Sequence, residues 1–227
     1  MTQANKELVN EFPFLKYDDD YEYTWLDDLE DGWRECFGIQ LCADLKDCLE
    51  ESDFLEDYRI SQIKEKWGQL RWYDNFGGDK WLEHLYAWTY ISEHTCKSCG
   101  KFPVPMRDDG WVSPYCDRCY KDLSWSLRKG KKTIEELTCE DPFNGRLLEY
   151  LHYREYDNGK YNDIYVDMKP YYKKIGYDSD NLISKEEYHQ YENYLLAAKE
   201  YEEKYGKIKD PCILPYEIQH MNPFKKD

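Results

Sequence analysis

The chain has 227 residues, a formal net charge of −16 and a mean hydropathy of −0.96. It contains no run of ~20 apolar residues, which excludes a conventional transmembrane helix. Such a polar, charged chain could be disordered, but aromatic residues make up 17% of it and each can bury ~150–250 Å². We therefore expect a folded, acidic protein with an aromatic core, divided into one large or two small domains.

The charge is unevenly distributed along the chain. Residues 1–57, the acidic front, hold 18 acids and 4 bases. Residues 95–133, the basic stretch, hold 9 bases and 4 acids, and the segment between them is neutral. The remainder, 134–227, is moderately acidic. The sequence thus contains two candidate interaction surfaces of opposite charge.

The first regular element is expected from Asp31, as an amphipathic helix of about twenty residues. Its apolar positions recur every three or four residues: Trp33, Cys36, Phe37, Leu41, Cys42, Leu45, Cys48 and Leu49. The face predicted to be exposed carries Glu35, Asp44, Asp47, Glu50 and Glu51.

A β-hairpin is predicted over residues 58–73, which are rich in β-branched and aromatic residues and have Gly68 in the middle. On its second strand, Leu70 and Trp72 should share one side. A turn follows, and the apolar spacing from Trp81 to Ile91 then predicts a second helix.

Four of the nine cysteines form two C-x₂-C pairs separated by sixteen residues. Pairs with this spacing hold tetrahedral Zn²⁺ through thiolates, so we predict a zinc site formed by Cys96, Cys99, Cys116 and Cys119. A hairpin turning at Asp109-Gly110 would complete a zinc ribbon. The alternative, two redox dithiols, suits the spacing poorly because such motifs follow a strand of a βαβ unit.

Four thiolates leave no open position for water, so the predicted zinc would be structural. His94 is an alternative ligand, although four cysteines already suffice. The remaining cysteines are scattered, and the start of the chain lacks the pattern of a signal peptide. Free thiols and a cytoplasmic location are therefore expected.

Residues 134–227 are rich in Tyr, Lys and Glu, and we predict a mainly helical region. Its strongest helix runs from Ser184 to Tyr205, with Ser184 and Glu187 spaced as a capping box. Residues 176–187 imitate a calcium-binding loop, but Gly176 stands in place of the first acidic ligand, which favours a simple turn. The sequence as a whole predicts an α+β fold with an acidic and zinc-ribbon domain over 1–133 and a second region over 134–227.

The motifs of the chain favour binding over catalysis. The chain contains no H-E-x-x-H, G-x-S-x-G or phosphate-binding glycine-rich loop. The stretch from Pro114 to Cys119 resembles the P-C-x-x-C half of the zinc deaminase motif, with Tyr115 inserted, but the upstream H-x-E that deaminase chemistry requires is missing. No catalytic residue is predicted.

The first binding hypothesis is a protein partner for the acidic front. Its acids and aromatic residues suit the basic groove of a nucleic-acid-handling protein, which they could occupy as a nucleic-acid backbone would. An acidic face that serves only solubility is equally compatible. The candidate residues are Asp18, Asp19, Asp20, Asp27, Asp28, Glu30 and Asp31.

The alternative is direct nucleic-acid binding by the basic stretch, where bases alternate with aromatic residues such as Trp111 and Trp125. The overall charge of −16 opposes it. The bases are Lys97, Lys101, Arg107, Arg118, Lys121, Arg128, Lys129, Lys131 and Lys132. No membrane partner is expected.

Four motifs over about residues 31–120 carry a resemblance: DGWRECFG from Asp31, IKEKWGQLRWYDN from Ile63, TCKSCG from Thr95 and GWVSPYCDRC from Gly110. In their order they resemble a group of uncharacterised zinc-ribbon proteins encoded by bacteriophages and prophages of low-GC Gram-positive bacteria. The resemblance implies a host-cell context in which small acidic proteins bind or block host nucleic-acid or defence machinery.

Overall fold

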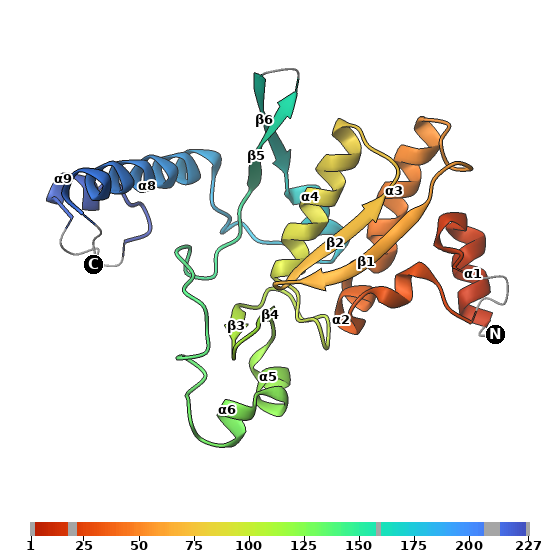
Figure 1. Ribbon diagram of the computed structural model, residues 1–227, viewed down its shortest axis with the longest axis horizontal. Helices are drawn as coiled ribbons and strands as arrows, with labels where there is room; N and C mark the ends of the chain where they lie inside the picture. The colour runs from red at the N-terminus through yellow and green to blue at the C-terminus, as the bar shows by residue number, and fades with distance from the viewer. Residues whose placement is uncertain (1–2, 18–21, 158–159, 207–213, 226–227) are drawn as a thin grey trace. The chain divides into compact units, whose positions relative to one another are not determined.

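The computed structural model describes residues 3–17, 22–157, 160–206 and 214–225 (Figure 1). The chain forms two compact units. Unit 1 comprises Met1–Glu140 and Pro170–Asp178, and unit 2 comprises Asp141–Lys169 and Ser179–Asp227. Within the described ranges, no helix combines the length and the apolar character needed to cross a membrane.

Unit 1 is built from short helices, two hairpins and a returning segment. Its elements are α1 (Gln3–Glu11), η1 (Pro13–Leu15), η2 (Trp25–Asp28), α2 (Asp31–Trp33), η3 (Arg34–Gly38), α3 (Ile39–Glu51), β1 (Ile60–Lys66), β2 (Gln69–Asp74), α4 (Asp79–Glu93), β3 (Met106–Asp108), β4 (Val112–Pro114), α5 (Asp117–Leu123), α6 (Trp125–Arg128) and most of α7 (Lys169–Lys174). The α2, η3 and α3 elements follow one another without a break, as the predicted helix from Asp31 requires.

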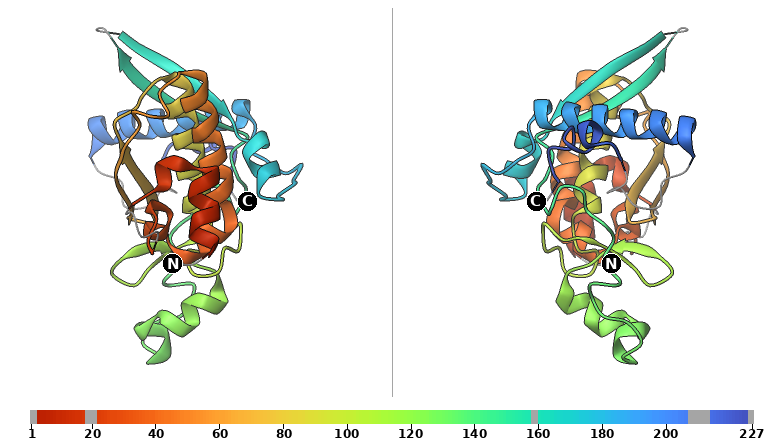
Figure 2. Two further views of the ribbon diagram at one scale, coloured as in Figure 1. Left: turned by 90° about the vertical axis from the view of Figure 1, so that its right-hand side faces the viewer. Right: turned by 90° about the vertical axis from the view of Figure 1, so that its left-hand side faces the viewer.

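The core of unit 1 lies between the β1–β2 hairpin and helices α3 and α4, which pack side by side on one face of the hairpin (Figures 1 and 2). Aromatic rings fill it as the composition predicted: Phe37 and Trp88 stack with ring centroids 5.5 Å apart. Leu70 and Trp72 face this core, while Tyr73 is exposed. The hairpin turns through two residues, Trp67 and Gly68, both with positive φ, the backbone of a tight hairpin turn.

One prediction for helix α3 is wrong. Asp44 was placed on the exposed face, but its side chain is buried, and its carboxylate accepts a hydrogen bond from the Trp88 indole at 3.0 Å. Lys174 of α7 forms an ion pair with the same carboxylate. Asp44 therefore lies within the apolar stripe, because partners from other elements satisfy its charge there.

The second hairpin of unit 1 is the ribbon that follows the first cysteine pair. β3 and β4 are antiparallel, with Asp108 opposite Val112, so the chain turns at Asp109-Gly110 as predicted. Residues 137–139 run alongside β3: Asp108 N–H donates to Leu137 O at 2.8 Å, and Cys139 N–H donates to Met106 O at 3.0 Å.

Unit 2 contains a hairpin that the sequence interpretation missed. Its elements are β5 (Tyr150–Asp157), β6 (Lys160–Asp167), α8 (Lys185–Tyr205) and α9 (Tyr216–Gln219). The region expected to be mainly helical thus includes two paired strands; their β-branched and aromatic residues, and the Asn158-Gly159 dipeptide between them in the sequence, are typical of a hairpin. The Ser184–Glu187 capping box is confirmed.

Candidate metal centre and binding surfaces

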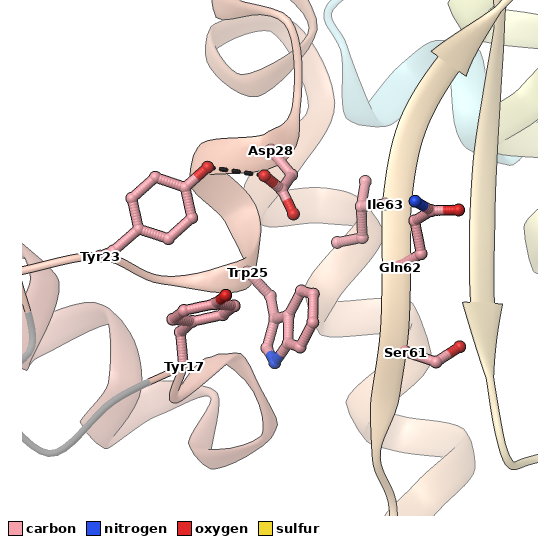
Figure 3. A pocket seen from close by; sticks show the side chains of 7 residues that line it. All are labelled: Tyr17, Tyr23, Trp25, Asp28, Ser61, Gln62 and Ile63. Atoms are coloured by element: carbon pink, nitrogen blue, oxygen red, sulfur yellow. Dashed lines mark hydrogen bonds between the residues drawn. The ribbon is translucent and has the colours of Figure 1, made fainter.

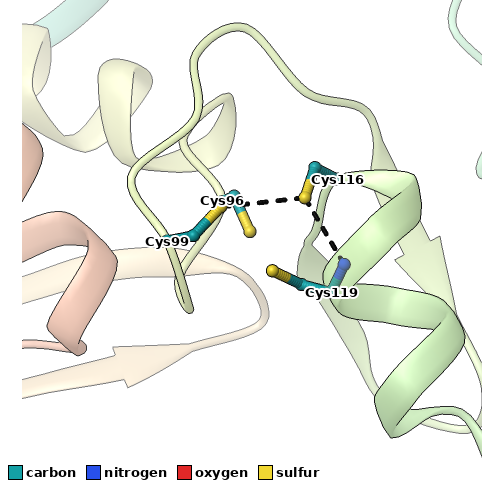
Figure 4. A group of neighbouring side chains, drawn as sticks. All are labelled: Cys96, Cys99, Cys116 and Cys119. Carbon is teal, nitrogen blue, oxygen red and sulfur yellow. Dashed lines mark hydrogen bonds between the residues drawn. The ribbon is translucent and has the colours of Figure 1, made fainter.

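Four cysteine sulfurs gather in unit 1 where the two C-x₂-C turns meet (Figure 4). The sulfurs of Cys96, Cys99, Cys116 and Cys119 lie within 4.8 Å of one another. The Cys99 and Cys116 sulfurs are 3.7 Å apart, and tetrahedral thiolates at about 2.3 Å from Zn²⁺ would be about 3.8 Å apart. The donor set therefore fits a single tetrahedral metal ion. In the described part of the chain, no other group of three His, Cys, Asp or Glu ligand atoms gathers in this way.

Each cysteine pair is shaped by local backbone hydrogen bonds. In the first turn, Gly100 has φ +70°, and its N–H donates to Cys96 O at 2.9 Å. In the second, Cys116 caps helix α5, and the N–H of Cys119 approaches the Cys116 sulfur at 3.5 Å. Backbone N–H groups directed at sulfur stabilise the thiolate form that a metal requires.

The thiols differ in how readily they ionise without a cation. Burial raises the pKa of Cys96 and of Cys119. Burial also opposes ionisation of Cys116, but the Cys119 N–H and the neighbouring thiols outweigh it and lower the pKa of Cys116. The arrangement suits a divalent ion, whose charge would favour thiolate at all four positions.

The cluster is attached to the core through the start of helix α2. Gly32 N–H donates to Lys97 O at 2.9 Å, and the indole N–H of Trp33 donates to Thr95 O at 2.9 Å. Trp33 is fully buried. The first cysteine turn therefore shares hydrogen bonds with an element more than sixty residues earlier in the chain.

The basic stretch divides into structural and exposed residues. Arg107 is buried and forms an ion pair with Asp117 and a hydrogen bond to Thr138. Lys97 is half-buried between Glu30 and Glu65, with Nζ–O distances of 3.3 and 3.6 Å. These two bases hold the fold together and are not available to a partner.

Lys101 is exposed beside the first cysteine turn. The other six predicted bases lie on what we call the basic arm, residues 117–132, which carries α5 and α6. All six are exposed, and within the described residues none forms an ion pair: Arg118, Lys121, Arg128, Lys129, Lys131 and Lys132. The Trp125 side chain is 50% exposed, and the Lys131 ammonium lies 3.9 Å from its ring centroid. Asp109 of the ribbon turn accepts hydrogen bonds from the Ser124 and Ser126 hydroxyls, which fixes the arm to the ribbon.

Several acids of the acidic front form ion pairs or hydrogen bonds within the protein, which the sequence did not indicate. Asp27 forms an ion pair with Arg34 and hydrogen bonds to Thr24, and Glu30 pairs with Lys97. Asp28 accepts a hydrogen bond from the Tyr23 hydroxyl at 2.6 Å. Asp31 is exposed at the start of α2, while Asp18, Asp19 and Asp20 lie outside the described residues.

Two features of the surface were not predicted from the sequence. Trp67, at the β1–β2 turn, has a 58% exposed side chain and a φ of +55°, a conformation that a bulky residue rarely adopts. A pocket also forms where the front meets β1, lined by Tyr17, Tyr23, Trp25, Asp28, Ser61, Gln62 and Ile63. The many aromatic residues of the acidic front were a signal for this pocket. Their assembly into a pocket, however, depends on contacts between the front and β1, which lie far apart in the sequence.

Comparisons with protein-family models, with curated proteins and with solved structures gave no match.

Proposed function

We propose that this chain is a zinc-stabilised binding protein that presents the basic arm to single-stranded nucleic acid. The zinc would be held by Cys96, Cys99, Cys116 and Cys119, and with four thiolate ligands it would act structurally. The observation that carries the nucleic-acid assignment is that all six bases of the arm are exposed and without an ion pair among the described residues.

The composition of the arm suits a single strand. Exposed lysines and arginines neutralise phosphates, and an exposed tryptophan can stack on any base. Trp125 and Lys131 bring these two functions together on one short helix and the turn that follows it. The cysteine cluster holds the start of the arm and the Asp109 contacts hold its middle, at Ser124 and Ser126, so little ordering of α5 and α6 would be needed on binding.

Binding of a fluorescent poly-dT oligonucleotide at several salt concentrations tests this proposal. The Lys129→Glu/Lys132→Glu variant should bind at least about tenfold more weakly at low salt, and the slope of log affinity against log salt should fall by about 1.4. The matched control is Lys173→Glu/Lys199→Glu, which makes the same charge change at exposed residues elsewhere. Equal losses in the two variants, or no binding at low salt, would overturn the proposal.

A protein partner for the acidic front is the second candidate. It is supported by the exposed rings of Tyr17 and Tyr23 beside the acids, because aromatic residues are enriched at protein interfaces. In the host-cell context suggested by the sequence resemblance, the partner would be a basic nucleic-acid-handling or defence protein. Affinity capture from a host lysate at two salt concentrations should recover such a protein with the native chain but not with Asp28→Asn/Asp31→Asn.

A further inference from the structure

The pocket at the acidic front has the walls of a cation-binding site (Figure 3). Its volume is about 570 Å³, within the range of small-molecule sites. Tyr17 lies edge to face with Tyr23 and with Trp25, at centroid distances of 5.3 and 4.9 Å. The negative faces of aromatic rings attract cations within about 6 Å of the ring centroid.

The aromatic walls are held in place by backbone pairing and by a helix cap. An antiparallel bridge joins Lys16 to Thr24, so that Tyr17 and Tyr23 lie next to each other. Thr24 in turn forms a capping box with Asp27 at the start of η2. That short helix carries Trp25 and Asp28 into the pocket.

Among the described lining residues, the Asp28 carboxylate gives the pocket its charge. Asp28 accepts the Tyr23 hydroxyl at 2.6 Å on Oδ1, and its Oδ2 has no hydrogen bond among the described residues. The hydrogen bond to Asp28 is the main cause that raises the pKa of Tyr23 to about 12, so this ring stays neutral at physiological pH. Among the described residues that line the pocket, none has a basic side chain, and the acidic front supplies an attractive field.

The polar groups of the pocket favour a cation that donates few hydrogen bonds. Gln62 Oε1 already accepts from the Lys64 ammonium at 2.6 Å, and the Ser61 hydroxyl donates to Tyr73 O at 3.0 Å. A primary ammonium needs acceptors for three N–H groups. A quaternary ammonium has no N–H group and instead contacts ring faces, as in the aromatic cages that recognise quaternary amines.

From these observations we propose that the pocket of Tyr17, Tyr23, Trp25 and Asp28 binds a quaternary ammonium group. The inference goes beyond nucleic-acid binding by the basic arm, because it concerns the acidic front instead and a ligand of opposite charge. It stands whether or not the basic arm binds nucleic acid.

The pair of probes that isolates the charge is choline and its neutral isostere 3,3-dimethyl-1-butanol. In calorimetric or NMR titration of the full chain loaded with zinc, choline should bind at least tenfold more tightly than the isostere. Equal affinities for the two, or no saturation by choline, would overturn the proposal.

Variants connect binding to the pocket. Tyr17→Ala and Trp25→Ala should each weaken choline binding at least tenfold, and Asp28→Asn at least threefold, whereas Tyr17→Phe should retain it because the ring remains. Tyr17 is 54% exposed, so Tyr17→Ala should keep the native melting temperature and zinc content even if Trp25→Ala does not fold. Unchanged choline affinity in folded Tyr17→Ala would count against the site.

Peptides identify the source of the ligand. A peptide containing trimethyllysine that binds more tightly than choline would indicate a methylated protein partner, and equal affinities would indicate a free quaternary amine. Either outcome requires that the unmodified lysine peptide bind more weakly. If it bound as tightly as the methylated one, the preference for a quaternary ammonium would be wrong.

Discussion

Gly32 lies directly against the backbone carbonyl of Cys96. A Cβ atom added at Gly32 would stand 2.2 Å from Cys96 O, 2.5 Å from Gly100 N and 2.8 Å from Cys99 N. The approach is equally close at Gly100, where an added Cβ would be 2.9 Å from Gly32 O. Two glycines thus allow helix α2 and the first cysteine turn to meet backbone to backbone.

The Gly32→Ala substitution should therefore displace the cysteine turn, because the groups it meets are backbone atoms that cannot rotate away. We expect destabilisation of about 2 kcal/mol or more and faster loss of zinc to a chelator, measured by thermal unfolding and by a colorimetric zinc assay. Gly38→Ala is the control, since its Cβ would meet Leu26 at an ordinary 3.5 Å. If Gly32→Ala matched this control, the contact would have no energetic importance.

Metal removal should destabilise unit 1 strongly, because a preformed tetrathiolate site contributes its binding energy to folding. Purified protein should contain one zinc per chain by elemental analysis. Chelation or Cys116→Ser should lower the melting temperature well beyond the effect of Cys139→Ser, a half-buried cysteine outside the cluster. Protein with neither zinc nor iron would contradict the assignment.

The carboxyl group of Glu93 should make stability depend on pH. Burial raises its pKa to about 7 against an ordinary value of 4.5, although Gln69 and Arg71 oppose the shift. Because the folded-state pKa is the higher one, the contribution of Glu93 to stability is complete below pH 4.5 and is lost as the pH rises through 7. Glu93→Gln should thus be more stable than the native chain by about 1–3 kcal/mol at pH 8.

Urea unfolding of the two chains between pH 5.5 and 8 measures this difference. It should shrink steadily toward the acidic end, and effects of pH on other groups cancel in the comparison. A difference that stayed constant with pH would show that Glu93 does not titrate in this range.

Removing the buried carboxylate of Asp44 should cost more than its position on a charged helix suggests. Asp44→Ala leaves the Trp88 indole N–H without its acceptor in the core, and we expect a loss of about 1–3 kcal/mol. The control is Asp47→Ala, at an exposed residue three positions further along α3. It should change the free energy of unfolding by no more than about 0.5 kcal/mol. Equal effects in denaturant titrations would refute the assigned role.

Asp44 also shows where inference from sequence fails. Periodicity correctly predicted the helix from Asp31, and local spacing predicted the cysteine cluster, because both signals lie within a few neighbouring residues. From sequence alone, however, an aspartate is assigned to the exposed face of a helix because its side chain is polar. Its burial depends on Trp88 and Lys174, which are 44 and 130 positions away.

The same limit applies to the candidate surfaces. Lys97 and Arg107 look like the other bases of the basic stretch, and only their contacts with Glu65 and Asp117 reveal a structural role. The aromatic pocket depends on the bridge between Lys16 and Thr24. Composition thus indicated which segments carry charge and rings, but long-range pairing decides which side chains remain available.

Helix α7 has a consequence for the order in which the protein can assemble during synthesis. Residues 170–178 belong to unit 1 although the chain first enters unit 2. Tyr171 shares a hydrogen bond of 2.7 Å with His84 and packs edge-on against Trp88. Domains usually fold from the N-terminus as they leave the ribosome, but this unit cannot be complete until Asp178 has emerged. A nascent chain can bring its four cysteines together before α7 has been synthesised. Trp88 packs against Tyr171 only after that helix has emerged.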